Sequence, residues 1–246
     1  MKKIFLAVCL SLAVIAASAQ DFRIGLKGTF NSTWLFNNNI SDQGNIADYA
    51  STFGTSFGIS SVLYFTENIG VAMDILYASN NQKLEGEIGP GLTYESVANV
   101  KYIDIPLLLR ISSEGGPYVE FGPQFSFLAG ATEDFTTSPS SPTVEYTDKD
   151  FKDDFSGFGL AVVLGFGVDI QANDNWFINI GLRFGYGMTD ATTEFTEAQV
   201  DADDAAGKHH SVYSGWAHTD ATPDFNYQKT NRAFGGFTLG VIYKFD

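Results

Sequence analysis

The sequence predicts an all-β fold: an eight-stranded antiparallel up-and-down transmembrane barrel with long extracellular loops and short periplasmic turns. Three observations predict it. Segments throughout the chain alternate apolar residues with small or polar ones at a period of two, which is typical of strands whose two faces meet different environments. Long and short connections between these segments alternate strictly, and the chain begins with the features of a secretory leader.

The composition favours strands over helices. The 246 residues include 22 Phe, 11 Tyr and 25 Gly but only 3 Met and 7 Pro, and aromatic residues are enriched in strands. The formal net charge is −15, whereas a nucleic-acid-binding protein needs a basic surface that displaces counterions from phosphates. We therefore expect no nucleic acid among the partners.

Residues 1–19 predict a cleaved signal peptide, followed by a single barrel domain at residues 20–246. A basic start at Lys2 and Lys3 precedes an apolar stretch and the small residues of a cleavage site. The alternative, an uncleaved anchor, has too short an apolar core to span a membrane comfortably, and no later apolar run approaches the roughly 20 residues of a membrane helix. Cys9 is the only cysteine, so the domain has no thiol for a disulfide, a metal or a nucleophile.

Eight segments show the strand pattern. In the hairpin of residues 101–127, for example, Ile103, Ile105 and Leu107 share one face, while Asp104 and Arg110 share the other. The expected strands are residues 22–30, 53–65, 69–78, 101–111, 118–127, 157–170, 176–186 and 236–245.

The connections place all long loops at one end of the predicted barrel and all short turns at the other. This asymmetry is typical of outer-membrane barrels, whose short turns face the periplasm, and soluble sandwiches lack it. The short turns are residues 66–68, 112–116 and 171–175, and the long polar loops are residues 31–52, 79–99, 132–155 and 189–230.

The charged face of the strands predicts a lumen filled by ion pairs. The lumen of an eight-stranded barrel is only just wide enough for side chains, and a full set of Phe and Leu would overfill it. We therefore expect the apolar face to contact lipid and the small and charged residues to point inward. A buried charge is costly unless it is paired, so we expect pairs such as Arg110 with Glu120; the alternative places some of these residues at the exposed rim. The expected interior network is Arg23, Lys27, Asp74, Asp104, Arg110, Glu120, Asp169, Arg183 and Lys244.

Several segments carry a resemblance to a known family. The most specific pair is VKYIDIPLLLRI with GPYVEFGPQFSFLAG, and FRIGLKGTFNSTW, DILYASNNQKL, GLAVVLGFGVDI, INIGLRFGYGMTD and FTLGVIYKF also match. On these residues the chain resembles the Bacteroidetes outer-membrane β-barrel domain family of PorT-like, or porin-family, proteins. The resemblance implies an eight-stranded barrel behind a signal peptide, inserted by the outer-membrane assembly machinery. The family that the chain resembles includes a component of a secretion apparatus. Such barrels usually finish on an aromatic residue, whereas here Asp246 follows Phe245.

One polar cluster in the last long loop has residue types used in catalysis or metal binding. Groups on a flexible acidic loop are not held to the tolerances that catalysis needs, and the Asp-rich segments 148–154 and 201–204 lack the glycine and terminal Glu of a calcium loop. We therefore expect no catalytic residue, no metal site and no cofactor, and we expect these segments to be solvated. The cluster comprises His209, His210, His218, Ser211, Ser214, Asp203, Asp204 and Asp220.

The leading functional hypothesis is a non-enzymatic integral protein of the cell outer membrane. Its side-chain-filled lumen favours a structural or interaction role through the acidic extracellular loops, with membrane lipid and envelope proteins as partners. A narrow passive, porin-like channel is the alternative, because the small residues of one strand could leave a polar path. An accessory role in a secretion apparatus follows from the resemblance alone. The small residues in question are Gly157, Gly159, Ala161, Gly165 and Gly167.

Overall fold

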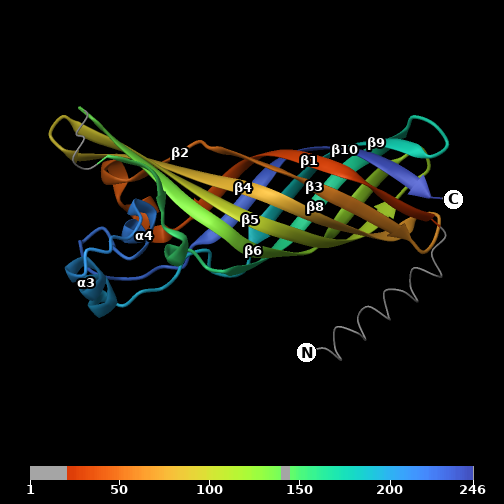
Figure 1. The fold of residues 1–246 in the computed structure, drawn as a ribbon. Coiled ribbons are helices and arrows are strands. Elements are labelled where there is room, and N and C mark those ends of the chain that lie inside the picture. Colours follow the sequence, from red (N-terminus) through yellow and green to blue (C-terminus); the bar gives the residue numbers. More distant parts are fainter. Residues whose placement is uncertain (1–20, 140–144, 246) are drawn as a thin grey trace, which may run out of the picture.

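Eight long antiparallel strands form a closed barrel in the computed structural model, which describes residues 21–139 and 145–245. Each strand pairs with its neighbours in chain order, and the first pairs with the last from Phe22 opposite Phe245 to Phe36 opposite Asn231, which closes the ring (Figure 1). The predicted eight-stranded up-and-down barrel is therefore confirmed. The predicted signal peptide lies outside the described residues. The barrel strands are β1 (Asp21–Phe36), β3 (Phe53–Tyr64), β4 (Ile69–Gly89), β5 (Leu92–Ser112), β6 (Pro117–Ser138), β8 (Phe158–Gln171), β9 (Trp176–Gly187) and β10 (Asn231–Phe245).

The outward face of these strands is apolar over the length that a membrane requires. Leu26 is 69% exposed and Phe57 66% exposed, values that suit side chains in contact with lipid rather than a protein core. About 9–11 residues of a tilted strand cross a membrane. Further outward side chains are Phe22, Phe30, Ile59, Ile75, Leu107, Phe121, Leu164, Phe184, Leu239 and Val241.

Short turns and the two described chain ends lie together at one end of the barrel (Figure 1). In the turn between β5 and β6, Gly116 has a φ of 99°, and a Cβ there would lie 2.1 Å from the Asp169 carbonyl oxygen, so only glycine fits. Aromatic pairs mark this end, with Phe22 stacked on Phe245 and Trp176 edge-on to Tyr243. Such an aromatic belt is typical of a membrane interface.

At the opposite end, β4 and β5 continue far beyond the barrel, and the predicted loop at residues 79–99 is wrong. The two strands stay paired up to a turn at residues 90–91. β4 has 21 residues, about 70 Å of strand at about 3.3 Å per residue. Here the outward residues are polar because they face water, so the segment does not show the apolar face by which the other strands were recognised. Lys83 supports the pairing, since its Nζ lies 2.7 Å from Glu85 and 2.6 Å from Glu95, two carboxylates directly opposite each other.

Two short strands widen this extension. β2 (Asp48–Ala50) pairs with β4, and β7 (Tyr146–Asp150) pairs with β6. We call the five-stranded sheet β2-β4-β5-β6-β7 beyond the barrel the outer extension. The two short strands bring the strand number to ten, while the barrel itself keeps eight.

The other long loops fold into short helices that gather at the same end, where Figure 1 labels α3 (Glu197–Ala205) and α4 (Val212–Ala217). Thr196 and Gln199 form a capping box at the start of α3, and the Ser211 hydroxyl accepts the Ser214 N–H at the start of α4. No helix in the described part of the chain is long and apolar enough to cross a membrane. The helices are α2 (Asn38–Asp42), η1 (Gly44–Ile46), η2 (Lys152–Asp154), α3 (Glu197–Ala205) and α4 (Val212–Ala217).

We call these loops and their helices the cap. The cap shares an apolar core with the inner face of the outer extension. Tyr213 on α4 is fully buried, and its hydroxyl donates to the Leu35 carbonyl oxygen of β1 at 2.6 Å. The core closes the outer end of the barrel. Its members are Leu35, Ile40, Ala47, Leu84, Tyr94, Ala98, Val100, Tyr102, Ala131, Phe155, Ala191 and Tyr213.

Inside the barrel, glycines on β8 and β9 make room for large side chains from other strands. A Cβ on Gly165 would lie 2.6 Å from Cγ of Glu120, and a Cβ on Gly185 would lie 2.2 Å from the Phe234 ring. The lumen therefore carries aromatic and aliphatic side chains as well as the predicted small and charged ones. A second buried cluster consists of Val62, Tyr64, Ala72, Leu108, Val163 and Phe234.

This packing predicts that Gly185→Ala destabilises the barrel by about 1–3 kcal/mol, because the new methyl group overpacks the lumen against Phe234. Gly157→Ala is the matched control, since a Cβ there meets nothing within 4 Å, and we expect it to change the unfolding free energy by less than about 0.5 kcal/mol. Urea unfolding of both variants in the same lipid vesicles measures the difference. Equal stabilities would contradict the packing described.

Candidate functional site

The centre of the lumen holds a chain of ion pairs that joins four strands. Asp74 on β4 accepts hydrogen bonds from Lys27 Nζ of β1 at 3.1 Å and from Arg183 Nη1 of β9 at 2.7 Å. The same guanidinium donates through Nε to Glu120 of β6 at 3.2 Å. All four side chains are buried. Each charge therefore has an opposite charge in contact, as a water-poor site requires.

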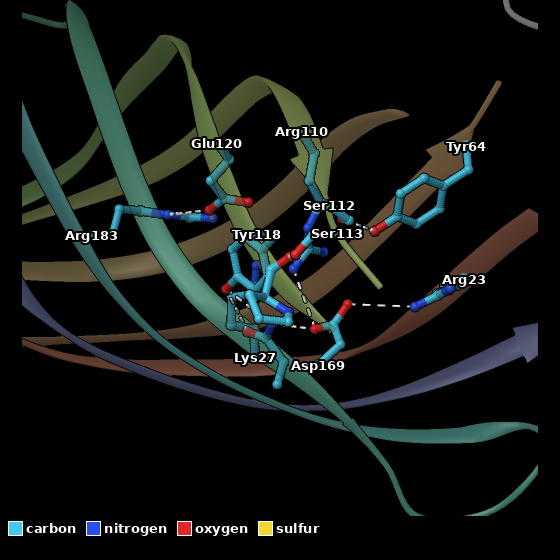
Figure 2. Close-up of polar contacts among 12 residues, drawn as sticks. Arg23, Lys27, Tyr64, Arg110, Ser112, Ser113, Tyr118, Glu120, Asp169 and Arg183 are labelled. Carbon is cyan, nitrogen blue, oxygen red and sulfur yellow. Dashed lines mark hydrogen bonds and ion pairs between the residues drawn. The ribbon is translucent and has the colours of Figure 1, made fainter. Parts of the chain in front are cut away.

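A second group of contacts lies between this centre and the turn end of the barrel (Figure 2). Asp169 of β8 accepts from Arg110 Nη2 of β5 at 3.3 Å, from Asn179 Nδ2 at 2.7 Å and from Arg23 Nη1 at 3.4 Å. The Arg110 guanidinium lies over the Tyr118 ring, with its central carbon 3.5 Å from the ring centroid. This cation–π contact adds to the ion pair. Asp169 thus links β8 to β5, β9 and β1.

The expected pairing of Arg110 with Glu120 differs from the contacts in the structure. The two residues are direct neighbours across β5 and β6, but Arg110 donates to Asp169 and Glu120 accepts from Arg183. The Arg110 guanidinium lies over the Tyr118 ring instead, and its Nη2 is within reach of Asp169 on β8. Together Lys27, Arg110 and Arg183 offset the charges of Asp74, Glu120 and Asp169.

The remaining predicted residues occupy the two ends of the lumen. Asp104 pairs with Arg232, whose Nη2 donates to it at 2.6 Å. At the turn end, Arg23 Nη2 lies 2.7 Å from Asp21, whereas Lys244 Nζ is 3.9 Å away from the same carboxylate. The Lys244 side chain is 34% exposed. Lys244 is therefore a rim residue, the alternative considered above for members of the network.

Arg232 was missed because it precedes the predicted start of the last strand. It is buried, its Nη1 donates to Ser126 at 3.0 Å, and its guanidinium lies 4.6 Å from the centroid of the Tyr102 ring. Its position has the same parity as the inward residues Thr238 and Gly240. Extending the period of two backwards from these residues could have found it.

Two buried carboxylates hold the start of α4: Glu133 from the outer extension and Asp154 from η2 of the cap. The burial of Asp154 is contrary to the expected solvation of residues 148–154. Glu133 on β6 accepts the Val212 N–H at 3.0 Å and the Tyr146 hydroxyl at 2.6 Å. Asp154 accepts the Ser211 N–H at 2.6 Å, and its other oxygen lies 3.0 Å from His210 Nδ1. Burial raises the pKa of Glu133. Both carboxylates satisfy N–H groups at the start of α4 that would otherwise be unpaired.

The three histidines do not converge on one site. His218 is buried at the end of α4, where its Nδ1 lies 2.8 Å from the Ser214 carbonyl oxygen and its Nε2 accepts the Phe195 N–H at 2.9 Å. His209 is exposed, and its Nδ1 is 3.4 Å from Asp204. The Ser211 hydroxyl serves as the cap of α4. Within residues 21–139 and 145–245, no group of three or more His, Cys, Asp or Glu side chains is arranged to hold a metal ion.

A closed eight-stranded barrel with an apolar outer belt and a charge-filled lumen defines an integral outer-membrane β-barrel. Residues 18–193 match the family described as "Outer membrane protein beta-barrel domain", and the chain belongs to this family. It is an outer-membrane protein. A search of curated proteins gives no match.

Solved barrels are similar over nearly their whole length but at low identity. OprG from Pseudomonas aeruginosa is 15% identical, with 93% of this chain and 97% of OprG covered and a TM-score of 0.37. Neisserial surface protein A is 13% identical, with coverages of 91% and 97% and a TM-score of 0.36. Ail of Yersinia pestis is 9% identical, with coverages of 92% and 100% and a TM-score of 0.37.

We expect Arg183→Ala to destabilise the barrel by about 3–5 kcal/mol, because it leaves Asp74 and Glu120 buried without this partner. Lys244→Ala removes a rim charge and should cost less than about 1 kcal/mol. Urea unfolding in lipid vesicles compares the unfolding free energies of the two variants.

A double-mutant cycle should give a larger coupling energy for Arg183 with Glu120 than for Arg110 with Glu120. The reverse order would refute the pairing described.

The cap should loosen on acidification through His218. Burial lowers the pKa of His218 below its usual value of about 6.5. When the cap unfolds, His218 becomes exposed and its pKa returns to the usual value, so at a pH below 6.5 the unfolded cap binds a proton more readily than the folded cap does. The folded cap therefore loses stability as pH falls from 6.5 towards the lowered pKa. Protonation also places an N–H on Nε2, opposite the Phe195 N–H. The protection factor of the Phe195 amide in hydrogen exchange should therefore fall below pH 6.5. The fall should persist in His209→Gln and disappear in His218→Gln.

Proposed function

We propose that the protein is a non-enzymatic outer-membrane barrel that acts through its outer surface and not through its lumen. One observation carries the proposal: the ion pairs around Asp74 and Asp169 cross the lumen with essentially no exposed side chain. Asp74 is 1% exposed, Arg110 0% and Glu120 2%. An ion entering this layer would have to displace charges that already have partners, which is costly in a low-dielectric site.

The alternative of a narrow passive channel is disfavoured by the same packing. The inward faces of Gly165 and Gly167 are occupied by the Glu120 side chain and the Tyr118 hydroxyl. A cavity of about 20 Å³ beside Gly159 and Arg232 has room for about one water molecule. Further out, the core of the cap adds a second closed layer.

The outer extension and the cap offer a surface for envelope partners. A hollow of about 550 Å³ on the extension is lined by Asp48, Glu85, Glu87 and Glu95, and the chain as a whole is acidic. This charge favours partners with basic groups and disfavours nucleic acid. Membrane lipid around the apolar belt and the assembly machinery during insertion complete the proposed partners, and we propose removal of the leader after Ala19.

A second proposal, an accessory role in a secretion apparatus, rests on sequence alone. The segments VKYIDIPLLLRI and GPYVEFGPQFSFLAG resemble PorT-like proteins of Bacteroidetes. Both lie in β5 and β6, the strands that carry Asp104, Arg110 and Glu120. Cross-linking in cells followed by identification of the attached envelope proteins distinguishes this role from a purely structural one.

Planar-bilayer recording tests the closed lumen. We expect the purified protein to give no stable single-channel steps under conditions in which a general porin conducts. Tyr118→Ala should increase ion leakage, because it removes the ring on which Arg110 rests; this variant checks that the assay detects an opened lumen. Regular single-channel steps from the unmodified protein would overturn the proposal in favour of a channel.

A further inference from the structure

A groove of about 440 Å³ lies between the cap helices and the inner face of the outer extension. Its size is within the range of about 300–1,000 Å³ found for small-molecule sites. It lies beyond the membrane-spanning part of the barrel and outside the lumen network. Its lining comprises Ile88, Tyr94, Phe135, Val200, Asp204, His209, His210, Ser211, Val212, Gly215, Trp216 and Thr219.

The floor of the groove is aromatic and fixed in place. Phe135 stacks on Tyr94 with 5.6 Å between ring centroids, and the Trp216 indole N–H donates to the Tyr94 hydroxyl at 3.0 Å. Ile88, near the tip of β4, is 49% exposed, although this part of the strand lies in water. These side chains together form an apolar surface that a ligand would remove from water.

The cap is anchored so that the groove stays open. Glu133 and Asp154 hold the start of α4, and Tyr213 ties the helix to β1. Helix α3 forms the opposite wall, yet none of its residues is buried. Val200 of α3 therefore faces the groove without packing into the core, and the wall does not close onto the floor.

The lining of the groove contains one carboxylate and no Lys or Arg. Asp204 supplies the carboxylate charge of the lining, and the exposed residues Asp201 and Glu197 lie on the same helix. The His210 side chain is 8% exposed and is held between two carboxylates outside the lining, because its Nδ1 lies 3.0 Å from Asp154 and its Nε2 lies 3.4 Å from Asp203.

We propose that the groove binds a small amphiphilic organic cation, an aromatic or apolar body that carries an amine. The body would lie on Trp216, Tyr94 and Phe135, where a cation also gains from the aromatic faces. The ammonium group would donate to the carboxylate of Asp204. An anion of the same shape would meet the charge of Asp204, and the lining contains no Lys or Arg to offset it.

This inference rests on the proposed role of the cap as a binding surface. The two can fail separately, since bilayer recording tests the closed lumen and ligand titration tests the groove. A protein that conducts ions could still bind the amine, and a closed barrel could fail to bind it.

Three naphthalene probes test the proposal with a constant apolar body: 2-naphthylmethylammonium, the neutral 2-naphthalenemethanol and the anionic 2-naphthoate. The protein is reconstituted into nanodiscs of zwitterionic lipid, with Trp34→Phe and Trp176→Phe so that Trp216 alone reports binding, and empty nanodiscs correct for partitioning. We expect saturable quenching by the ammonium, about five- to tenfold weaker binding of the alcohol, and no saturable binding of the anion.

Matched variants test whether the Asp204 carboxylate is the charge that binds the ammonium probe. Asp204→Asn should weaken binding of the ammonium about fivefold and leave the alcohol unchanged, whereas Asp201→Asn removes the same charge outside the groove and should change neither by more than twofold. Ile88→Asp, at an exposed position, should weaken binding of the alcohol, because that binding depends on the apolar surface. Equal binding of the three probes, equal effects of Asp204→Asn and Asp201→Asn, or binding of a basic peptide but of no small amine would each overturn the proposal.

Discussion

The structure depends on the neutrality of the charges buried in its lumen. Lys27, Arg110 and Arg183 face Asp74, Glu120 and Asp169 across a space that is only just wide enough for side chains. Because the partners come from strands far apart in sequence, each ion pair fixes the position of one part of the wall relative to another. The glycines of β8 make room for these large side chains, and the apolar and aromatic side chains of the lumen fill the space that the pairs leave.

The period of two, the alternation of long and short connections and the narrow lumen together predicted the barrel, its lipid-facing belt and the inward direction of the charged residues. They were not sufficient to choose partners. Arg110 and Glu120 are neighbours on adjacent strands, and this neighbourhood suggested a pair, but the closed ring brings Asp169 and Arg183 within reach of them. Contacts across a lumen depend on strand tilt and register, which a linear pattern does not contain. Arg232 was lost for a simpler reason, since its strand begins five residues before the predicted start.

The outer parts were predicted less well because polarity was taken as a sign of a loop. In β4, the alternation continues beyond Tyr77 with Asn, Lys and Glu on the outward face, which is the pattern of a strand in water. Composition failed in a similar way for the acidic segments. Glu133 and Asp154 belong to stretches rich in carboxylates, yet they are buried and accept N–H groups of α4. Nothing in the local sequence separates them from their solvated neighbours.

The continuity of β4 and β5 from the lipid-facing belt into the outer extension sets the height of the groove. From Tyr77 to Ile88, a strand tilted as in outer-membrane barrels rises about 30 Å. The aromatic floor thus lies well outside the lipid headgroups, on strands that stay paired from the barrel up to their turn. Molecules dissolved outside the cell reach it directly, while the acyl chains that surround the barrel do not.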